Sequence, residues 1–202
     1  VLFFFTIRLT IPFLFQVNTQ TIGLTGRYTN NDLPSFITEA IGDGLTSLAE
    51  SGLPSPNLAS SWETPNKGKT WIFHLSEGKT WQDGTDITSD SIVYEFSDVS
   101  TKRPDAKTII FELEEPFSLF PVIVSRPTFK KGLLGTGEWK VERVSFEGNF
   151  VQELVIENGE GALKTYKFYP TIERTKLAFK LGQVDKLTEM LDPAPFHTWN
   201  SA

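Results

Sequence analysis

Residues 58–94 have the sequence LASSWETPNKGKTWIFHLSEGKTWQDGTDITSDSIVY, which carries the densest structural signal of the chain. Within it, the side chains of residues 70–75 alternate between two faces. Trp71, Phe73 and Leu75 lie on one face, and Thr70, Ile72 and His74 lie on the other. Successive side chains of a β-strand point to opposite faces of the sheet. The alternation therefore predicts a strand over residues 70–75 whose aromatic face packs into a core.

A helix is predicted directly after this segment. Thr88 has the position of a helix N-cap, and Asp90 in the first turn suits the positive end of the helix dipole. Apolar residues then follow at helical spacing, namely Ile92, Val93, Phe96 and Val99. This pattern predicts a packing helix rather than a functional site.

The remaining elements point to a mixed α/β chain. One further helix is expected after a cap at Asn31 or Asp32, with Pro34 in its first turn, and another between the cap Thr171 and the stop at Gly182. Strands or short apolar segments are expected at residues 21–29, 58–62, 108–113, 137–144, 150–156 and 164–169.

Composition excludes several classes of function. The 202 residues contain no cysteine, so disulfides, thiolate metal sites and cysteine nucleophiles are excluded. The formal net charge is −6 and no basic run occurs, which argues against a nucleic acid as partner. The 39% hydrophobic content is enough to bury a sizeable core.

The chain offers no convincing catalytic or metal-binding set. Its two histidines, His74 and His197, are far apart in the sequence. Two Gly-Lys-Thr tripeptides lack the upstream glycine of a phosphate-binding loop. The acidic pairs Glu114 with Glu115 and Asp83 with Asp86 are typical of solvated turns. We therefore expect no enzyme activity, no catalytic residues, no metal and no cofactor.

The first 16 residues form a separate segment. Val1 to Phe15 (VLFFFTIRLTIPFLF) is apolar apart from Arg8 and a few threonines, and is shorter than the roughly 20 residues of a membrane-spanning helix. One interpretation is a truncated signal peptide or membrane anchor. The alternative is a pair of buried strands split near Arg8 and Pro12, and periodicity does not separate the two.

Four blocks in residues 58–94 occur in the order of a known family: LASSWE, GKTWIFHL, EGKTWQDG and ITSDSIVY. Further blocks follow at residues 111–117 (FELEEPF), 135–141 (GTGEWKV) and 178–185 (AFKLGQVD). Together they resemble the family 5 bacterial extracellular solute-binding proteins, which include the oligopeptide-, dipeptide- and nickel-binding components of ABC importers. Ser76 and Ser91 depart from the family pattern without touching an obvious site.

The resemblance implies a fold and a function. It implies that residues 17–202 form the first, incomplete lobe of a two-lobed periplasmic-binding-protein-like fold, whose second lobe is missing here. It implies an extracytoplasmic, membrane-associated protein that acts as a monomer with the membrane permease subunits of an ABC importer. The solute, a peptide or similar small molecule, would be captured by closure of the two lobes.

The same resemblance suggests where the solute binds. By position, Gly26, Arg27, Tyr28 and Thr29 match the end of the family's first strand, which faces the cleft and can offer backbone groups to an extended peptide. The alternative for Arg27 and Tyr28 is that they simply cover the lobe surface. At the level of function, the alternative is a surface-anchored interaction or glycan-binding module with no transport role.

Overall fold

The structure is a computed structural model that describes residues 18–189 and residue 194. The described residues divide into two compact units. The first unit contains the described residues 18–31, 142–189 and 194, and the second unit contains residues 32–141. The predicted segment 1–16 lies outside the described residues, and the boundary at residue 17 stays a prediction.

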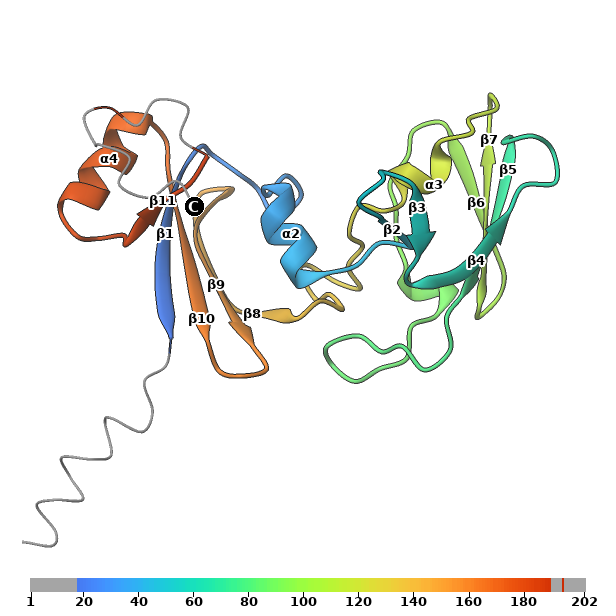
Figure 1. The fold of residues 1–202 in the computed structure, drawn as a ribbon, viewed down its shortest axis with the longest axis horizontal. Coiled ribbons are helices and arrows are strands. Elements are labelled where there is room, and N and C mark those ends of the chain that lie inside the picture. Colours follow the sequence, from blue (N-terminus) through green and yellow to red (C-terminus); the bar gives the residue numbers. More distant parts are fainter. Residues whose placement is uncertain (1–17, 190–193, 195–202) are drawn as a thin grey trace, which may run out of the picture. The chain divides into compact units, whose positions relative to one another are not determined.

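The first unit is built on a five-stranded sheet in the order β11-β1-β10-β9-β8 (Figure 1). Strand β1 is parallel to both of its neighbours, β10 and β11, whereas β10 and β9 are antiparallel. One helix, α4, packs against β1 and β10. The elements are β1 (Thr19–Thr25), β8 (Trp139–Glu147), β9 (Phe150–Asn158), β10 (Leu163–Tyr169), α4 (Ile172–Lys180) and β11 (Lys186–Leu187).

The second unit is built on a four-stranded antiparallel sheet in the order β4-β5-β7-β6, with a separate β2-β3 hairpin. Its helices are short. The elements are α2 (Ser35–Ile41), β2 (Thr46–Leu48), β3 (Pro54–Pro56), β4 (Ala59–Glu63), β5 (Thr70–Leu75), the 3-10 turn η1 (Ser89–Ser91), β6 (Val99–Asp105), β7 (Thr108–Leu113) and α3 (Phe120–Ile123).

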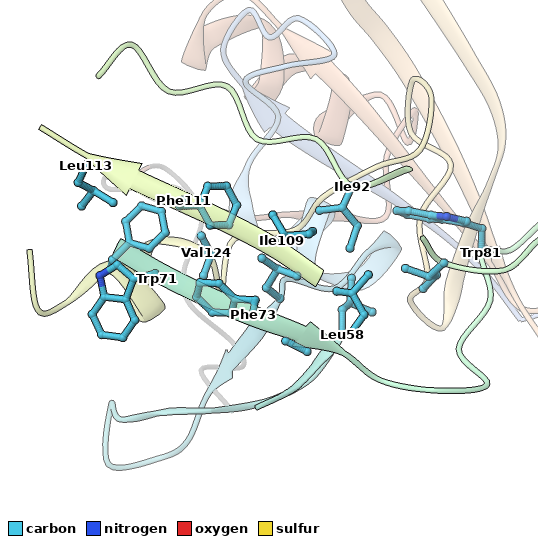
Figure 2. Packing of buried hydrophobic residues seen from close by; sticks show 14 residues of the cluster. Leu58, Trp71, Phe73, Trp81, Ile92, Ile109, Phe111, Leu113 and Val124 are labelled. Carbon is cyan, nitrogen blue, oxygen red and sulfur yellow. The ribbon is translucent and has the colours of Figure 1, made fainter. Parts of the chain in front are cut away.

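The strand predicted at residues 70–75 is confirmed as β5, and its aromatic face forms the core of the second unit. Trp71, Phe73 and Leu75 are buried on one face of β5, while His74 is exposed. The ring of Phe73 meets that of Phe111 on β7 edge to face, with ring centroids 5.8 Å apart. Figure 2 shows this cluster gathered along β5 and β7. Burial of these large side chains is the main favourable term in folding this unit.

The helix predicted from Thr88 is wrong. Thr88 and Ser91 do form a reciprocal capping box, but the turn stops after Ser91, and Ile92 has extended φ and ψ angles. The guanidinium of Arg103 donates to the carbonyls of Ser89 and Ile92, at 2.7 and 3.0 Å. Because tertiary partners occupy these carbonyls, the backbone is satisfied without a helix. Of the four residues in the predicted stripe, Ile92 is buried and Phe96 and Val99 pack partly buried against the core, whereas Val93 is exposed.

Smaller corrections concern the start of the chain. Strand β1 ends at Thr25, whereas the predicted strand extended to Thr29. Helix α2 begins at Ser35 after Pro34, and neither Asn31 nor Asp32 caps it. The helix predicted after Thr171 is confirmed as α4, and Gly182 follows it with a left-handed φ of 67°.

Two glycines of the Gly135-Thr136-Gly137 segment allow close backbone approach in the second unit. A Cβ atom on Gly135 would lie 2.1 Å from the carbonyl oxygen of Ile41. The amide of Gly137 donates to the same carbonyl at 2.8 Å. The side-chain amide of Gln82 adds hydrogen bonds to the carbonyls of Gly137 and Trp139, both at 2.9 Å. These contacts join the beginning and the end of the second unit.

The Trp81 to Thr85 turn has a structural role. Trp81 is buried and its indole N–H donates to the hydroxyl of Ser91 at 3.0 Å. Gly84 takes the left-handed φ of 79° that the turn requires. A hydrogen bond from the Thr85 hydroxyl, followed by one from Lys130, lowers the pKa of Asp83 from 3.8 to about 2. Asp83 is therefore ionised at neutral pH and is unsuited to act as a general acid.

We expect Gly135→Ala to destabilise the second unit by about 2–3 kcal/mol, because the new methyl group would overlap the Ile41 carbonyl and neighbouring backbone would have to shift. Urea unfolding followed by tryptophan fluorescence measures the change. Gly159→Ala is the matched control, since nothing lies within 4 Å of its Cβ position. Equal urea midpoints of unfolding for the two variants would contradict the close approach of Gly135 to the Ile41 carbonyl.

We expect Asp83 to contribute stability that is complete above pH 3.8 and is lost as the pH falls from 3.8 to about 2, because its pKa is lower in the folded state. Thr85→Ala should raise the pKa of Asp83 towards 3.8, since the Thr85 hydroxyl is the largest cause of the shift. Carbon-detected NMR titration of the side-chain carboxyl measures it. Lys131→Ala should leave that pKa unchanged, and a wild-type pKa near 3.8 would refute the assignment.

Candidate functional site

The candidate site lies where β1 and β10 of the first unit end. The two strands run parallel over seven residue pairs, so Thr25 and Tyr169 are partners at the same edge of the sheet. The pairing continues into the loop, because the amide of Gly26 donates to the carbonyl of Tyr169 at 2.8 Å. In open α/β sheets, ligands bind outside the carboxyl ends of the strands. The predicted segment Gly26–Thr29 starts at such an end.

The backbone of this segment is fixed by local contacts. Gly26 has a φ of 143°, and a Cβ atom there would lie 2.5 Å from the ring of Tyr28. That ring packs on Phe168, with the ring centroids 5.3 Å apart. The carbonyl of Tyr28 accepts a hydrogen bond from the amide of Val151 at 2.7 Å. Glycine at position 26 is therefore needed for Tyr28 to fold back over the sheet.

Arg27 is the exposed charge of this segment. Its guanidinium lies over the ring of Phe150, 5.3 Å from the centroid, which orients the side chain by a cation–π contact. Arg27 and Gly26 line a hollow of about 350 Å³ whose other walls come from the β8–β9 turn, β10 and α4. The guanidinium-bearing residue Arg174 and the carboxylate-bearing residue Glu147 also line this hollow.

Helix α4 brings Arg174 to the hollow. Thr171 caps the helix by accepting a hydrogen bond from the amide of Arg174 at 3.4 Å. The hydroxyls of Thr25 and Thr175 are 2.7 Å apart and connect the end of β1 to the first turn of α4. Hydrogen bonds from its own backbone amide and from the Thr171 hydroxyl lower the pKa of Glu173. The helix start is thus well defined, and Arg174 is carried on a capped turn.

A larger open groove of about 940 Å³ adjoins the hollow along β9, β10 and α4. The two share Phe168, Pro170 and Arg174, among others. Leu177 of α4 and Leu181 at its C-cap line the groove and are largely exposed. Burial, with a smaller effect of the Glu153 charge, raises the pKa of the Tyr169 hydroxyl, so this group is a neutral hydrogen-bond donor there.

The structure separates the four predicted binding residues into two groups. Gly26 and Arg27 line the hollow, whereas Tyr28 and Thr29 line neither the hollow nor the groove. Sequence reasoning missed Phe150 and Arg174. The Thr171 cap predicted after a strand could have indicated Arg174, because it places that residue in the first turn beyond the sheet edge.

Other candidate chemistry is limited in the described part of the chain. Residues 18–189 contain no group of three histidines or acidic residues that could hold a metal ion. His74 is exposed on β5, 3.8 Å from the carboxylate of Glu63. Among the described helices, none has the length and apolar content needed to cross a membrane.

Comparison with known proteins places this fold among binding proteins. A family model described as "Bacterial extracellular solute-binding proteins, family 5 Middle" matches residues 54–153. The periplasmic oligopeptide-binding protein OppA of Salmonella typhimurium is 36% identical over 75 residues, covering 36% of this chain and 14% of its own length. The dipeptide-binding protein DppE of Bacillus subtilis is 23% identical over 145 residues, covering 54% of this chain and 27% of its own length.

Solved structures share the fold at low identity. The PBP AgaA in complex with agropinic acid from A. tumefacien R10 aligns with a TM-score of 0.61 and 23% identity, covering 83% of this chain and 43% of the other. NikZ from Campylobacter jejuni in complex with Ni(L-His) aligns with a TM-score of 0.64 and 17% identity, covering 83% and 42%. The predicted periplasmic-binding-protein-like α/β fold is confirmed. The chain spans less than half the length of these relatives.

We expect Thr171→Ala to cost about 1 kcal/mol of α4 stability, because it removes the side-chain cap. It should also raise the pKa of Glu173 towards its ordinary value. Amide hydrogen exchange of residues 174–181 measures the first effect. Thr171→Ser keeps the hydroxyl and is the control, so faster exchange in both variants would argue against the cap.

Proposed function

We propose, because this chain belongs to the family 5 bacterial extracellular solute-binding proteins, that it captures peptides or similar small solutes for an ABC importer. Membership of the family gives the solute-binding role. The peptide class is supported by the names of the Salmonella typhimurium and Bacillus subtilis relatives, which are oligopeptide- and dipeptide-binding proteins. Several relatives are named as periplasmic, which supports an extracytoplasmic location.

The observation that carries the proposal is the hollow beside Gly26 and Arg27. Two arginines, Arg27 and Arg174, line a space of about 350 Å³ that Phe150 also lines. Guanidinium groups bind carboxylates through paired hydrogen bonds, and aromatic rings pack on apolar side chains. A peptide offers both kinds of group. The proposed binding segment is Gly26–Thr29, in which Gly26 and Arg27 contact the solute.

The proposed mechanism requires no covalent step. Arg27 is held over Phe150 before the solute arrives, so less side-chain entropy is lost on binding. In the whole protein, the solute would lie in a cleft closed by a second lobe. The closed state would be favoured because only there does the solute contact both lobes. Permease subunits in the membrane would then receive the closed form.

We expect Arg27→Ala to weaken peptide binding at least about tenfold, since a hydrogen bond to a charged group is worth about 1.5–3 kcal/mol. Arg27→Lys should lie between Arg27→Ala and the wild type, because the charge remains while the paired geometry is lost. Calorimetric titration of the natural gene product with a mixed-sequence peptide library measures the affinity. Lys131→Ala is the charge-matched control and should bind like the wild type.

Titrations with simple sugars and with nickel complete the test. Saturable heat with peptides that Arg27→Ala reduces would support both the peptide class and the proposed site. Heat with sugars or nickel alone would keep the solute-binding role and overturn the peptide class. No measurable heat of binding with any of the three probes would favour an interaction module without a transport role.

A further inference from the structure

A groove in the second unit is separate from the hollow described above. It has a volume of about 360 Å³ and lies where β7 ends and β6 begins. Phe96, Leu113 and Phe120 form its inner surface, and Pro116, Phe117 and Ile123 also line it. All of these residues belong to the second unit, so the groove depends only on that unit.

Part of the apolar lining is exposed. The side chains of Phe117 and Ile123 are 41% and 40% exposed, and that of Leu119 between them in sequence is 59% exposed. Single exposed apolar residues are normal, but an apolar groove continuous with exposed aromatic and aliphatic side chains is typical of an interaction site. The groove therefore has the character of a docking surface.

The groove is held in place by backbone contacts. The amide of Phe117 donates to the carbonyl of Gly68 at 2.9 Å, and its carbonyl accepts from the indole N–H of Trp71 at 3.2 Å. The ring of Phe96, which also lines the groove, stacks on that of Tyr94 with centroids 5.8 Å apart. Arg126 covers Phe96 from 4.9 Å. Preformed walls lower the entropic cost of binding.

The rim of the groove is negatively charged. Asp98, Glu114 and Glu115 line it and are exposed. Within the part of the chain that the structure describes, none of the three carboxylates forms an ion pair with a basic side chain. The guanidinium of Arg126 packs on the ring of Phe96 and donates to the carbonyl of Glu95. The three rim charges are thus available to a partner.

We propose that this groove binds a segment of a partner protein that carries an apolar side chain flanked by Lys or Arg. The apolar side chain would lie between Phe96 and Phe117, and the basic groups would pair with Glu114, Glu115 and Asp98. Charge complementarity selects this partner, because an acidic segment of the same shape would face three like charges. The volume suits one or two side chains of an extended segment.

Terminally blocked acetyl-Arg-Leu-Leu-Arg-amide is the probe, and acetyl-Glu-Leu-Leu-Glu-amide is its matched control. Blocked ends remove the terminal charges of a free peptide solute. In nitrogen-15 correlation spectra of the chain, the basic peptide should shift amides of residues 96–99 and 113–123. We expect the acidic peptide to bind at least about tenfold more weakly, since like charges at an interface disfavour association.

Variants separate the groove from the solute site. The double variant Glu114→Lys with Glu115→Lys should weaken binding of the basic peptide about tenfold. The double variant Glu39→Lys with Glu160→Lys makes the same charge change elsewhere and should leave that binding unchanged. Phe117→Ala should abolish the local shifts while the other amide positions report an intact fold. Arg27→Ala should leave binding unchanged, so this inference and the proposed function can fail independently.

Three outcomes would overturn the inference. One is equal binding of the two peptides. Another is shifts confined to residues 26–29 and 147–152, which would mean that the probe binds the hollow instead. The last is concentration-dependent shifts of residues 96–99 and 113–123 without peptide, which would assign the groove to a second copy of the chain.

Discussion

The parallel pairing of β1 with β10 is the constraint on which the first unit depends. Strand β1 has only β10 and β11 as neighbours, and both belong to the far end of the described chain. The hydroxyl contact that extends this pairing, from Thr25 to Thr175, joins residues 150 positions apart. Closing so long a loop is entropically costly, although the cost grows only slowly with length. A second unit that is compact by itself shortens the effective loop.

The second unit is compact by itself because its main sheet and its hydrophobic core are both formed within residues 32–141. The four strands of its main sheet are antiparallel, and the aromatic face of β5 packs within the unit. Gln82 and the Gly135-Thr136-Gly137 segment then join the end of α2 to the start of β8. The two ends of the inserted segment are thereby held close together, as a unit inserted into a sheet requires.

The same pairing creates the candidate site. Because β1 and β10 end at one edge, the loop after β1 and the helix after β10 meet there, and Arg27 and Arg174 line one hollow. The second unit carries a groove of the opposite charge, lined by Phe117 and rimmed by Glu114 and Glu115. The two surfaces suit ligands of different chemistry, one with a carboxylate and one with basic groups.

The sequence by itself determined the elements whose signal is local. The alternation of Trp71, Phe73 and Leu75 was sufficient for β5, and Thr171 with Gly182 was sufficient for α4, because the pleat of a strand and the caps of a helix depend on residues a few positions apart. Only the tertiary structure decided the backbone after Thr88, where Arg103 takes carbonyls that a helix would use, and the position of Arg174 beside Arg27. Both depend on contacts between segments distant in the chain, which no local pattern encodes.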